Sequence, residues 1–310
     1  MFTIVIPVYN RKRLITRLLD SIAAQTLRPL SVIIVDNAST DGTHPCVENW
    51  INAHNNIGIN FQLLKELVPG AAAARNCGLL AVTTPFCCFF DSDDTLRPEF
   101  AETILNKFTS TEAPDIVLYK STTHLPGTKA LSNTPSKKHI LRKHILHGTL
   151  ATQAYAARTE VFLNAGEWNP DTRIWDDWEL GIRILRNTQL AISDPAENVI
   201  ADKYFIEDSI TGNTFADKVI ELEKVLAIAE QDVSDNKYYS SLIQLVRARL
   251  AGRIHREGDK DAAQLILSKM SHTNRCSKAI LYAAYFYTRL FKRGCDIWAE
   301  PLLRLLNKQS

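Results

Sequence analysis

Three aspartates stand within four positions, directly after an apolar run. The run Pro85–Phe90 is continuously apolar, and Asp91, Asp93 and Asp94 follow it. A short aromatic run of this kind is typical of a strand that is buried on both faces of a sheet. Carboxylates at the C-terminal end of such a strand project into the crevice where open α/β sheets bind ligands.

Like charges this close together repel one another, so the cluster requires a compensating cation. A divalent metal that carries a polyphosphate is the natural candidate, because hard oxygen ligands suit Mg²⁺ or Mn²⁺. The alternative is an acidic turn in which Asp94 or Thr95 caps the next helix. The pattern D-x-D-D alone leaves both possibilities open.

Two other predicted strand ends carry side chains that could bind a nucleotide. Asp36 follows the apolar run Val32–Val35 and could accept from a base or a ribose hydroxyl, or could simply open a turn. Pro7 cannot donate to a ladder, so the first strand is expected to stop or bulge there. Tyr9 could lay its ring on a flat base, or could pack as an ordinary aromatic at the rim.

The segment Gly70–Gly78 predicts a helix that starts with small residues. Small side chains allow a ligand to approach the backbone closely. Arg75 is the cation in this segment and is well placed for a pyrophosphate. The alternative is a tightly packed helix in which Arg75 pairs with Asp91 or Asp93.

A second acidic cluster lies among aromatic residues. Asp176 and Asp177 stand between Trp175 and Trp178, at the expected start of a helix. Partial desolvation raises the pKa of a carboxyl, which suits proton abstraction, and the two indole rings could stack on sugars. The alternative is a pair of carboxylates that cap a surface helix.

Strands and helices alternate over the first 120 residues. Apolar runs predict strands at 3–8, 32–35, 59–64, 86–90 and 115–119, and helical spacing predicts helices at 11–25, 46–52, 71–82 and 98–108. This alternation favours a parallel sheet with right-handed crossovers. Residues 121–150 are poorly patterned and predict a mobile excursion with a short helix near 140–146. After about residue 215 the pattern is entirely helical.

The last forty residues are basic and aromatic. Residues 271–310 carry Arg275, Lys278, Arg289, Lys292, Arg293, Arg304 and Lys308 against Asp296 and Glu300. An amphipathic helix pair of this composition can lie on an anionic membrane surface, and the ordinary alternative is a helical subdomain that packs its aromatics on the core.

The overall composition is that of an ordinary globular protein. The 310 residues are 45% hydrophobic and 23% charged, and the net charge of +2 gives no electrostatic case for nucleic acid. The N-terminus lacks the basic region of a signal peptide, and no apolar stretch approaches the ~20 residues that span a bilayer. The six cysteines show no C-x-x-C pair, which favours a reducing cytoplasm.

Taken together, the motifs resemble those of family 2 glycosyltransferases, which have the GT-A fold. The resemblance covers about residues 1–210 and rests on Ile4–Asn10, Val35–Thr43, Ala74–Gly78, Phe90–Asp94, Gly166–Trp168 and Trp175–Leu180. It implies an α/β fold with a mostly parallel central sheet and a C-terminal helical subdomain. The expected divisions are a glycosyltransferase domain at 1–212, with a nucleotide-sugar half at 1–120 and an acceptor half at 121–212, and a helical region at 213–310.

The resemblance also implies roles for individual residues. The base and ribose would be held by Pro7, Tyr9, Asp36 and Arg75, and the nucleotide would also be contacted by Asp91 and Ser92. Mg²⁺ or Mn²⁺ would be bound across the phosphates by Asp93 with Asp91. The acceptor would be contacted by Trp175 and Trp178. Asp177 resembles the general base, with Asp176 at a position where the family usually has Glu. Near residue 205 many relatives have Tyr-Arg and a His that can help to hold the metal or phosphate. This chain has Phe205 and Glu207 there, and whether Glu207 replaces the His as a ligand stays open.

The function that follows is an inverting, metal-assisted glycosyltransferase. The expected donor is a nucleotide-sugar, a UDP-sugar ahead of a GDP- or dTDP-sugar, and the expected acceptor is a glycan or a lipid-linked oligosaccharide. The expected location is the cytoplasm or the inner face of the membrane, through the basic C-terminal helices. A nucleotidyltransferase is a rival, although the first strand lacks the Gly-rich basic loop that binds a triphosphate. A non-catalytic nucleotide-sugar-binding or glycan-binding protein is the other.

Overall fold

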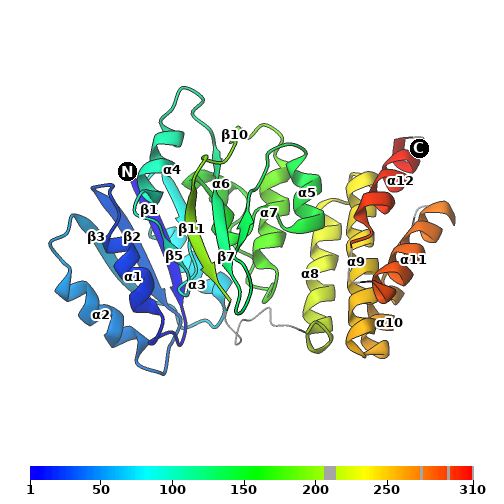
Figure 1. Ribbon diagram of the computed structural model, residues 1–310, viewed down its shortest axis with the longest axis horizontal. Helices are drawn as coiled ribbons and strands as arrows, with labels where there is room; N and C mark the ends of the chain where they lie inside the picture. The colour runs from blue at the N-terminus through cyan, green and yellow to red at the C-terminus, as the bar shows by residue number, and fades with distance from the viewer. Residues whose placement is uncertain (206–213, 273–274, 292–293, 309–310) are drawn as a thin grey trace. The chain divides into compact units, whose positions relative to one another are not determined.

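The computed structural model describes residues 1–205, 214–272, 275–291 and 294–308, which fold into two compact units (Figure 1). The sheet unit comprises Met1–Ile140, Thr149–Arg173 and Arg183–Ile206. The helical unit comprises Leu141–Gly148, Ile174–Ile182 and Glu207–Ser310. The chain therefore enters the helical unit twice before it reaches its last third.

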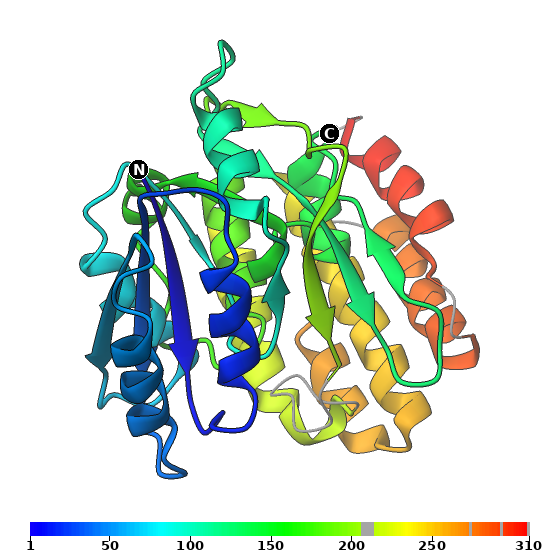
Figure 2. The same ribbon diagram turned by 60° about the vertical axis from the view of Figure 1, so that its left-hand side comes forward.

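A seven-stranded mixed sheet forms the centre of the sheet unit. Its order is β10 (Ile192–Ser193), β6 (Ile116–Leu118), β9 (Tyr155–Arg158), β4 (Phe86–Phe89), β1 (Phe2–Val8), β2 (Leu30–Asp36) and β3 (Ile59–Lys65). The neighbours β4, β1, β2 and β3 are all parallel, and β1 to β3 lie side by side in Figure 2. Only β9 runs antiparallel to its neighbours β4 and β6 among the described strands of this sheet. The predicted mostly parallel α/β sheet is confirmed.

A second, four-stranded sheet was not predicted. It pairs β5 (Thr95–Leu96), β11 (Val199–Tyr204), β7 (Lys120–His124) and β8 (Leu131–Asn133) in that order. The strands β7 and β8 lie in the segment 121–150, for which the sequence predicted an unpatterned excursion ending in a short helix. The helix is present as α5 (Ile140–His147). The strands escaped prediction because β7 is polar and is fixed by parallel pairing with the distant β11.

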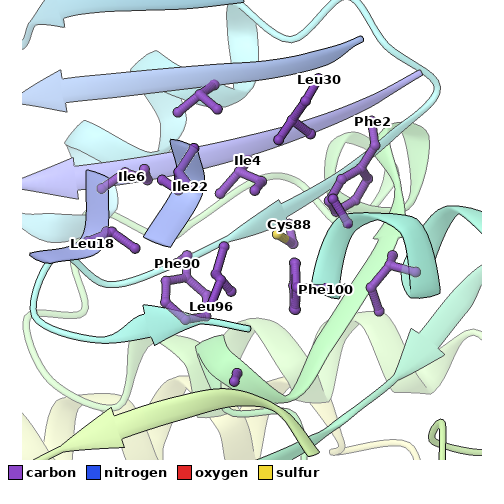
Figure 3. Close-up of a cluster of buried hydrophobic side chains, with 14 of the residues drawn as sticks. Phe2, Ile4, Ile6, Leu18, Ile22, Leu30, Cys88, Phe90, Leu96 and Phe100 are labelled. Carbon is purple, nitrogen blue, oxygen red and sulfur yellow. The ribbon is translucent and has the colours of Figure 1, made fainter. Parts of the chain in front are cut away.

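Three helices cover one face of the central sheet. They are α1 (Ile15–Ala23), α2 (Thr43–Ala53) and α4 (Phe100–Phe108). Their apolar side chains form one continuous core with those of the even-numbered residues of β1 (Figure 3). Ile15, Leu18, Leu19 and Ile22 of α1 are fully buried at helical spacing. Each such side chain contributes about 1.5–3 kcal/mol when it leaves water.

The opposite face of the sheet holds α3 (Ala71–Leu80) and α6 (Thr159–Asn164). Side chains alternate across a strand, so Val5 and Phe89 point to this face, where Phe89 packs edge-on against Phe162. Gly78 of α3 lies directly over Val5: a Cβ added there would be 2.4 Å from Val5 Cγ1. The absence of a side chain at Gly78 therefore allows α3 to lie close to β1.

The expectation that the first strand stops or bulges at Pro7 is wrong. Strand β1 continues to Val8, with Pro7 in register with Val35 of β2. Val8 O accepts from Asn37 N beside β2, and Val5 O accepts from Phe90 N beside β4. The nitrogen of Pro7 consequently faces the β4 side, where the ladder has already ended at Val5. Proline removes no ladder bond at that position.

The helical unit is built around one long helix. Helix α9 (Lys237–Glu257) packs against α8 (Val219–Asp232), α10 (Lys260–Ser268), α11 (Arg275–Leu290) and α12 (Asp296–Lys308). Its buried Arg247 forms ion pairs with Glu223 and Glu230 of α8. The unit also contains most of α5 and the start of α7 (Asp176–Arg186). The predicted C-terminal helical part is confirmed.

Replacing Gly78 by Ala tests the close packing of α3. An exposed Gly→Ala change inside a helix ordinarily stabilises by about 1 kcal/mol. Here the new methyl group collides with Val5, so we expect destabilisation by about 1–3 kcal/mol, measured by thermal or urea unfolding. The double variant Gly78→Ala with Val5→Ala should be destabilised by less than the sum of the two single variants, because the colliding methyl group of Val5 is gone. A single variant as stable as the wild-type chain would contradict this account.

Candidate functional site

Strand β2 ends in a buried carboxylate that its neighbours hold in place. Asp36 is 2% exposed, its Oδ1 accepts from Ser39 N at 3.3 Å, and its Oδ2 lies 3.3 Å from His44 Nδ1. Next to it, Asn37 donates to the carbonyls of Glu66 and Val68, and its Oδ1 accepts from Gly70 N at 2.8 Å. The turn that was considered as an alternative is present, and it also fixes the loop that leads into α3.

The end of β1 lies beside this loop. Asn10 adopts a left-handed φ of +50°, and its side-chain oxygen accepts from Thr40 N at 2.8 Å. This bond ties the segment after β1 to the segment after β2. Tyr9 is 56% exposed, so its ring can still be covered by a ligand.

Arg75 pairs with the first aspartate of the cluster, as one of the two alternatives predicted. Its Nη2 lies 3.0 Å from Asp91 Oδ1, and its guanidinium carbon lies 4.4 Å from the centre of the Trp168 ring. Gln153 donates to the other oxygen of Asp91. Gln153 was not predicted as a site residue, because it stands 62 positions from Asp91 and only the fold brings the two together. Trp168 belongs to one of the motifs of the family resemblance, but its contact with Arg75 was not predicted.

Asp93 is the less constrained carboxylate of the cluster. Burial raises the pKa of the Asp93 carboxyl and the charge of Asp91 raises it further, whereas Arg11 and Arg17 lower it. Arg11 Nε lies 3.8 Å from Asp93 Oδ2, and Arg17 donates to the backbone carbonyl of Asp93. Neither arginine was predicted as a site residue, although both stand in the segment that follows the first strand.

Asp94 has a structural partner rather than a capping role. It is 4% exposed, and its Oδ1 accepts from Tyr204 N at 2.8 Å. Burial, with the charges of Asp91 and Asp93, raises the pKa of Asp94 to about 8. Glu99 precedes helix α4, and no side chain caps it. The alternative in which Asp94 or Thr95 caps the next helix is therefore not what the structure has: Glu99 is the N-cap residue, and Asp94 links the cluster to β11. Ser92 is buried between the aspartates.

The carboxylates fit a hard dication whose other ligands come from a diphosphate. Within the described ranges, no three His, Cys, Asp or Glu side chains are arranged as a ready metal site. Mg²⁺ and Mn²⁺ in nucleotide sites are typically held by one or two carboxylates together with substrate phosphates and water. Asp93, which is largely buried and whose Oδ2 lies 3.8 Å from Arg11 Nε, could supply a donor of that type.

The second acidic cluster begins helix α7 in the helical unit. Asp177 N donates to Asp176 Oδ1 at 3.0 Å, and Trp178 N donates to Asp177 Oδ1 at 2.8 Å. Both carboxylates therefore satisfy amides of the first turn, as the capping alternative expected. Trp178 is buried, and its indole N–H donates to the carbonyls of His144 and Ile145. It positions the start of α7 on α5.

A cavity of about 860 Å³ lies beside this helix start, and all of its lining residues belong to the helical unit. Its lining includes Trp175, Asp177, Trp178, Phe215, Arg249, Arg253 and Arg256. The ring of Trp175 packs edge-on against those of Trp178 and Phe215. The three arginines follow the spacing i, i+4, i+7 on α9, a pattern visible in the sequence that the analysis overlooked.

Two remaining predictions concern the end of β11 and the C-terminus. Phe205 is 38% exposed, and Glu207 lies outside the described residues. No helix in the described ranges combines the length and the hydrophobicity needed to cross a membrane.

Two curated bacterial proteins are similar to part of the chain. The minor teichoic acid biosynthesis protein GgaA of Bacillus subtilis is 29% identical over 123 residues, which is 38% of this chain and 27% of that protein. A teichoic acid poly(glycerol phosphate) polymerase of Staphylococcus epidermidis is 34% identical over 124 residues, 40% of this chain and 17% of the relative. The matched segment thus spans well under half the length of either relative.

Solved structures share the whole fold at low sequence identity. The crystal structure of S. aureus TarS 1-349 superimposes with a TM-score of 0.63 at 16% identity and covers 100% of this chain and 92% of that one. The mannosyltransferase PcManGT from Pyrobaculum calidifontis, in complex with GDP-Man and Mn²⁺, gives a TM-score of 0.59 at 17% identity, over 99% and 86% of the two chains. At these identities the likeness establishes the fold alone.

The profile described as "Glycosyl transferase family 2" matches residues 3–163, more than half of the chain. The matched range contains β1, β2, α3 and β4, together with the aspartate cluster that ends the last of these strands. This protein belongs to glycosyltransferase family 2.

Proposed function

We propose that the protein transfers a sugar from a UDP-sugar to a glycan or lipid-linked acceptor, with inversion and with the help of Mg²⁺ or Mn²⁺. The observation that carries this proposal is the cluster of three aspartates at the end of β4, in which burial and mutual repulsion raise the pKa of Asp93 and Asp94. A site that disfavours its own charge in the free protein gains most from a bound dication.

The donor would bind at the carboxyl ends of β1, β2 and β4. Asp36 would accept from the base or ribose, Tyr9 would cover the base, and Arg75 would face the diphosphate. Asp91 and Ser92 would contact the nucleotide, and Pro7 would shape the end of β1. In support, a TarS 1-349 structure is described in complex with UDP-GlcNAc, with a TM-score of 0.63 to this chain.

The dication would be held by Asp93, with Asp91, and by the two phosphates. When bound, it neutralises the charge that grows on the leaving diphosphate. Arg75 adds a fixed guanidinium, which its stacking on Trp168 holds in place. The Mn²⁺ in the PcManGT complex is a property of that protein and is consistent with the same chemistry here.

Asp177 would act as the general base. Inversion requires one in-line displacement, in which the acceptor oxygen bonds to the anomeric carbon while the bond from that carbon to the diphosphate breaks. Asp177 would take the proton of the acceptor hydroxyl, and Asp176 would hold it through the first turn of α7. Trp175, with Trp178 behind it, would offer an aromatic wall for the acceptor.

The division at 212/213, the peripheral membrane contact and the cytoplasmic location remain predictions. The two rivals differ in what they would make. A nucleotidyltransferase would release pyrophosphate from NTP and a sugar phosphate, and a non-catalytic binding protein would bind the donor without turnover.

Two variants separate donor binding from proton transfer. Asp93→Ala should abolish the Mn²⁺-dependent part of UDP binding, because the remaining carboxylates are engaged by Arg75, Gln153 and Tyr204. Asp177→Asn should bind UDP normally and lose about 10²- to 10⁴-fold in transfer rate. Binding is measured by thermal shift, where ligand at 100 times its Kd stabilises by about 2.7 kcal/mol.

The matched control is Asp194→Asn, since Asp194 is a 63%-exposed carboxylate of the sheet unit. It should change neither measurement. Full transfer by the Asp93 or the Asp177 variant would refute the assigned roles. A screen of UDP, GDP, dTDP and CDP in the same assay identifies the base.

Asp94 makes the stability of the free protein depend on pH. Its folded-state pKa of about 8 lies above the unfolded value of 3.8, so the folded chain holds a proton that the unfolded chain releases. Stability is therefore lost as pH rises towards 8, by on the order of 1 kcal/mol per pH unit at most. Asp94→Asn retains an acceptor for Tyr204 N–H and cannot ionise.

We expect the Tm of Asp94→Asn to fall less between pH 6 and pH 8 than the Tm of the wild-type chain. Each kcal/mol of difference in the free energy of unfolding corresponds to about 2–4 °C in Tm. Differential scanning calorimetry without metal measures it, and Asp194→Asn should reproduce the wild-type slope. Parallel slopes for Asp94→Asn and wild type would show that Asp94 is already ionised at pH 6.

A further inference from the structure

The cavity of the helical unit joins an aromatic wall to a basic one. Trp175, Trp178 and Phe215 form the first, and Arg249, Arg253 and Arg256 of α9 form the second. The volume of about 860 Å³ lies in the range of small-molecule sites and is far more than one side chain or a few waters would fill. Asp177, the proposed base, lines the same cavity.

Arg249 and Arg256 are held by neighbours but keep donors for a ligand. Arg249 uses Nη1 for both of its bonds, to Leu146 O at 2.9 Å and to Asp296 Oδ1 at 3.0 Å. Arg256 also uses only Nη1, for the carbonyls of Thr288 and Phe291. An arginine has five N–H donors in a planar fork. Within the described ranges, Nε and Nη2 of both side chains carry no hydrogen bond.

Arg253 is positioned in a different way. Its Nε lies 2.9 Å from Glu257, and its guanidinium lies 3.9 Å from the centre of the Phe215 ring. Stacking on an aromatic ring and an i,i+4 carboxylate fix the plane of the guanidinium before any ligand arrives. Two of the arginines thus face carboxylates, while Arg256 is held by carbonyl oxygens alone and its positive charge is not neutralised by any described acid.

The charges of the cavity point to an anion. His147 also lines it, and burial lowers the pKa of His147, so the imidazole is neutral at pH 7. Three guanidinium groups in one cavity favour an anionic ligand over a neutral glycan. The planar guanidinium group of arginine can donate two hydrogen bonds to the oxygens of a phosphate. An indole ring can pack on the apolar face of a sugar or polyol.

We propose that this cavity binds the acceptor through a phosphate group, which Arg256 and Arg249 contact while Trp175 packs on the adjoining sugar or polyol. The proposal rests on the proposed function for the role of Asp177. The phosphate could belong to a polyol-phosphate polymer or to a polyprenyl diphosphate, and the chemistry at the arginines is the same for both.

The first test is direct binding of phosphate compounds to the full chain, read by tryptophan fluorescence. The probes are a glycerol phosphate trimer, farnesyl diphosphate below its micelle concentration, and glycerol as the neutral counterpart. Arg256→Gln should weaken binding of a phosphate probe about 10- to 100-fold, the loss of one charge-assisted interaction. Arg256→Lys should lose less, because it keeps the charge but not the fork. Which probe binds more tightly identifies the source of the phosphate.

Controls separate this site from fold and from donor chemistry. Lys260→Gln removes an exposed cation of the same unit that does not line the cavity, and it should bind every probe as the wild type does. Arg256→Gln should retain the wild-type UDP–Mn²⁺ thermal shift and donor hydrolysis, while its KM for a phosphorylated acceptor rises. Equal affinity of wild type and Arg256→Gln for the phosphate probes, or equal binding of glycerol, would overturn the proposal. A failure of UDP binding alone would overturn the proposed function and leave the phosphate result standing.

Discussion

The structure depends on the mutual repulsion of three aspartates at the end of one buried strand. Asp91, Asp93 and Asp94 crowd negative charge at one strand end, and the surroundings of each differ: Arg75 lies 3.0 Å from Asp91, Arg11 lies 3.8 Å from Asp93, and burial raises the pKa of Asp94 to about 8. Nearby arginines thus compensate the negative charge of this cluster only in part. This imbalance is the property that a metal-bound diphosphate can exploit.

The parallel sheet converts this local chemistry into a site. Because β1, β2 and β4 are parallel neighbours, their carboxyl ends meet at one edge, and Asp36 and Asp91 are brought there from different parts of the sequence. Close packing of α3 on β1, which Gly78 permits, then delivers Arg75 to Asp91. The ion pair between Arg75 and Asp91 therefore depends on the close packing of α3 on β1.

The sequence predicted what local patterns encode. Strands β1 to β4, the helices between them and the C-terminal helices follow from periodicity, and the acidic ends follow from their position after apolar runs. It did not predict what sequence-distant pairing decides: the antiparallel pairing of β9 with β4 and β6, the pairing of β7 with β11, and the contacts of Gln153 and Tyr204 with the cluster. The three arginines of α9 follow a helical spacing that is present in the sequence, but the cavity that they line is formed only by the fold.

The helical unit, and not the sheet unit, carries the proposed base. Residues 174–182, which carry Asp177, and residues 141–148 belong to this unit although segments of the sheet unit flank them. Arg249 binds the carbonyl at the end of α5, and Phe215 packs on Trp175. The helices after residue 214 therefore position the proposed base, although they lie beyond the matched residues 3–163.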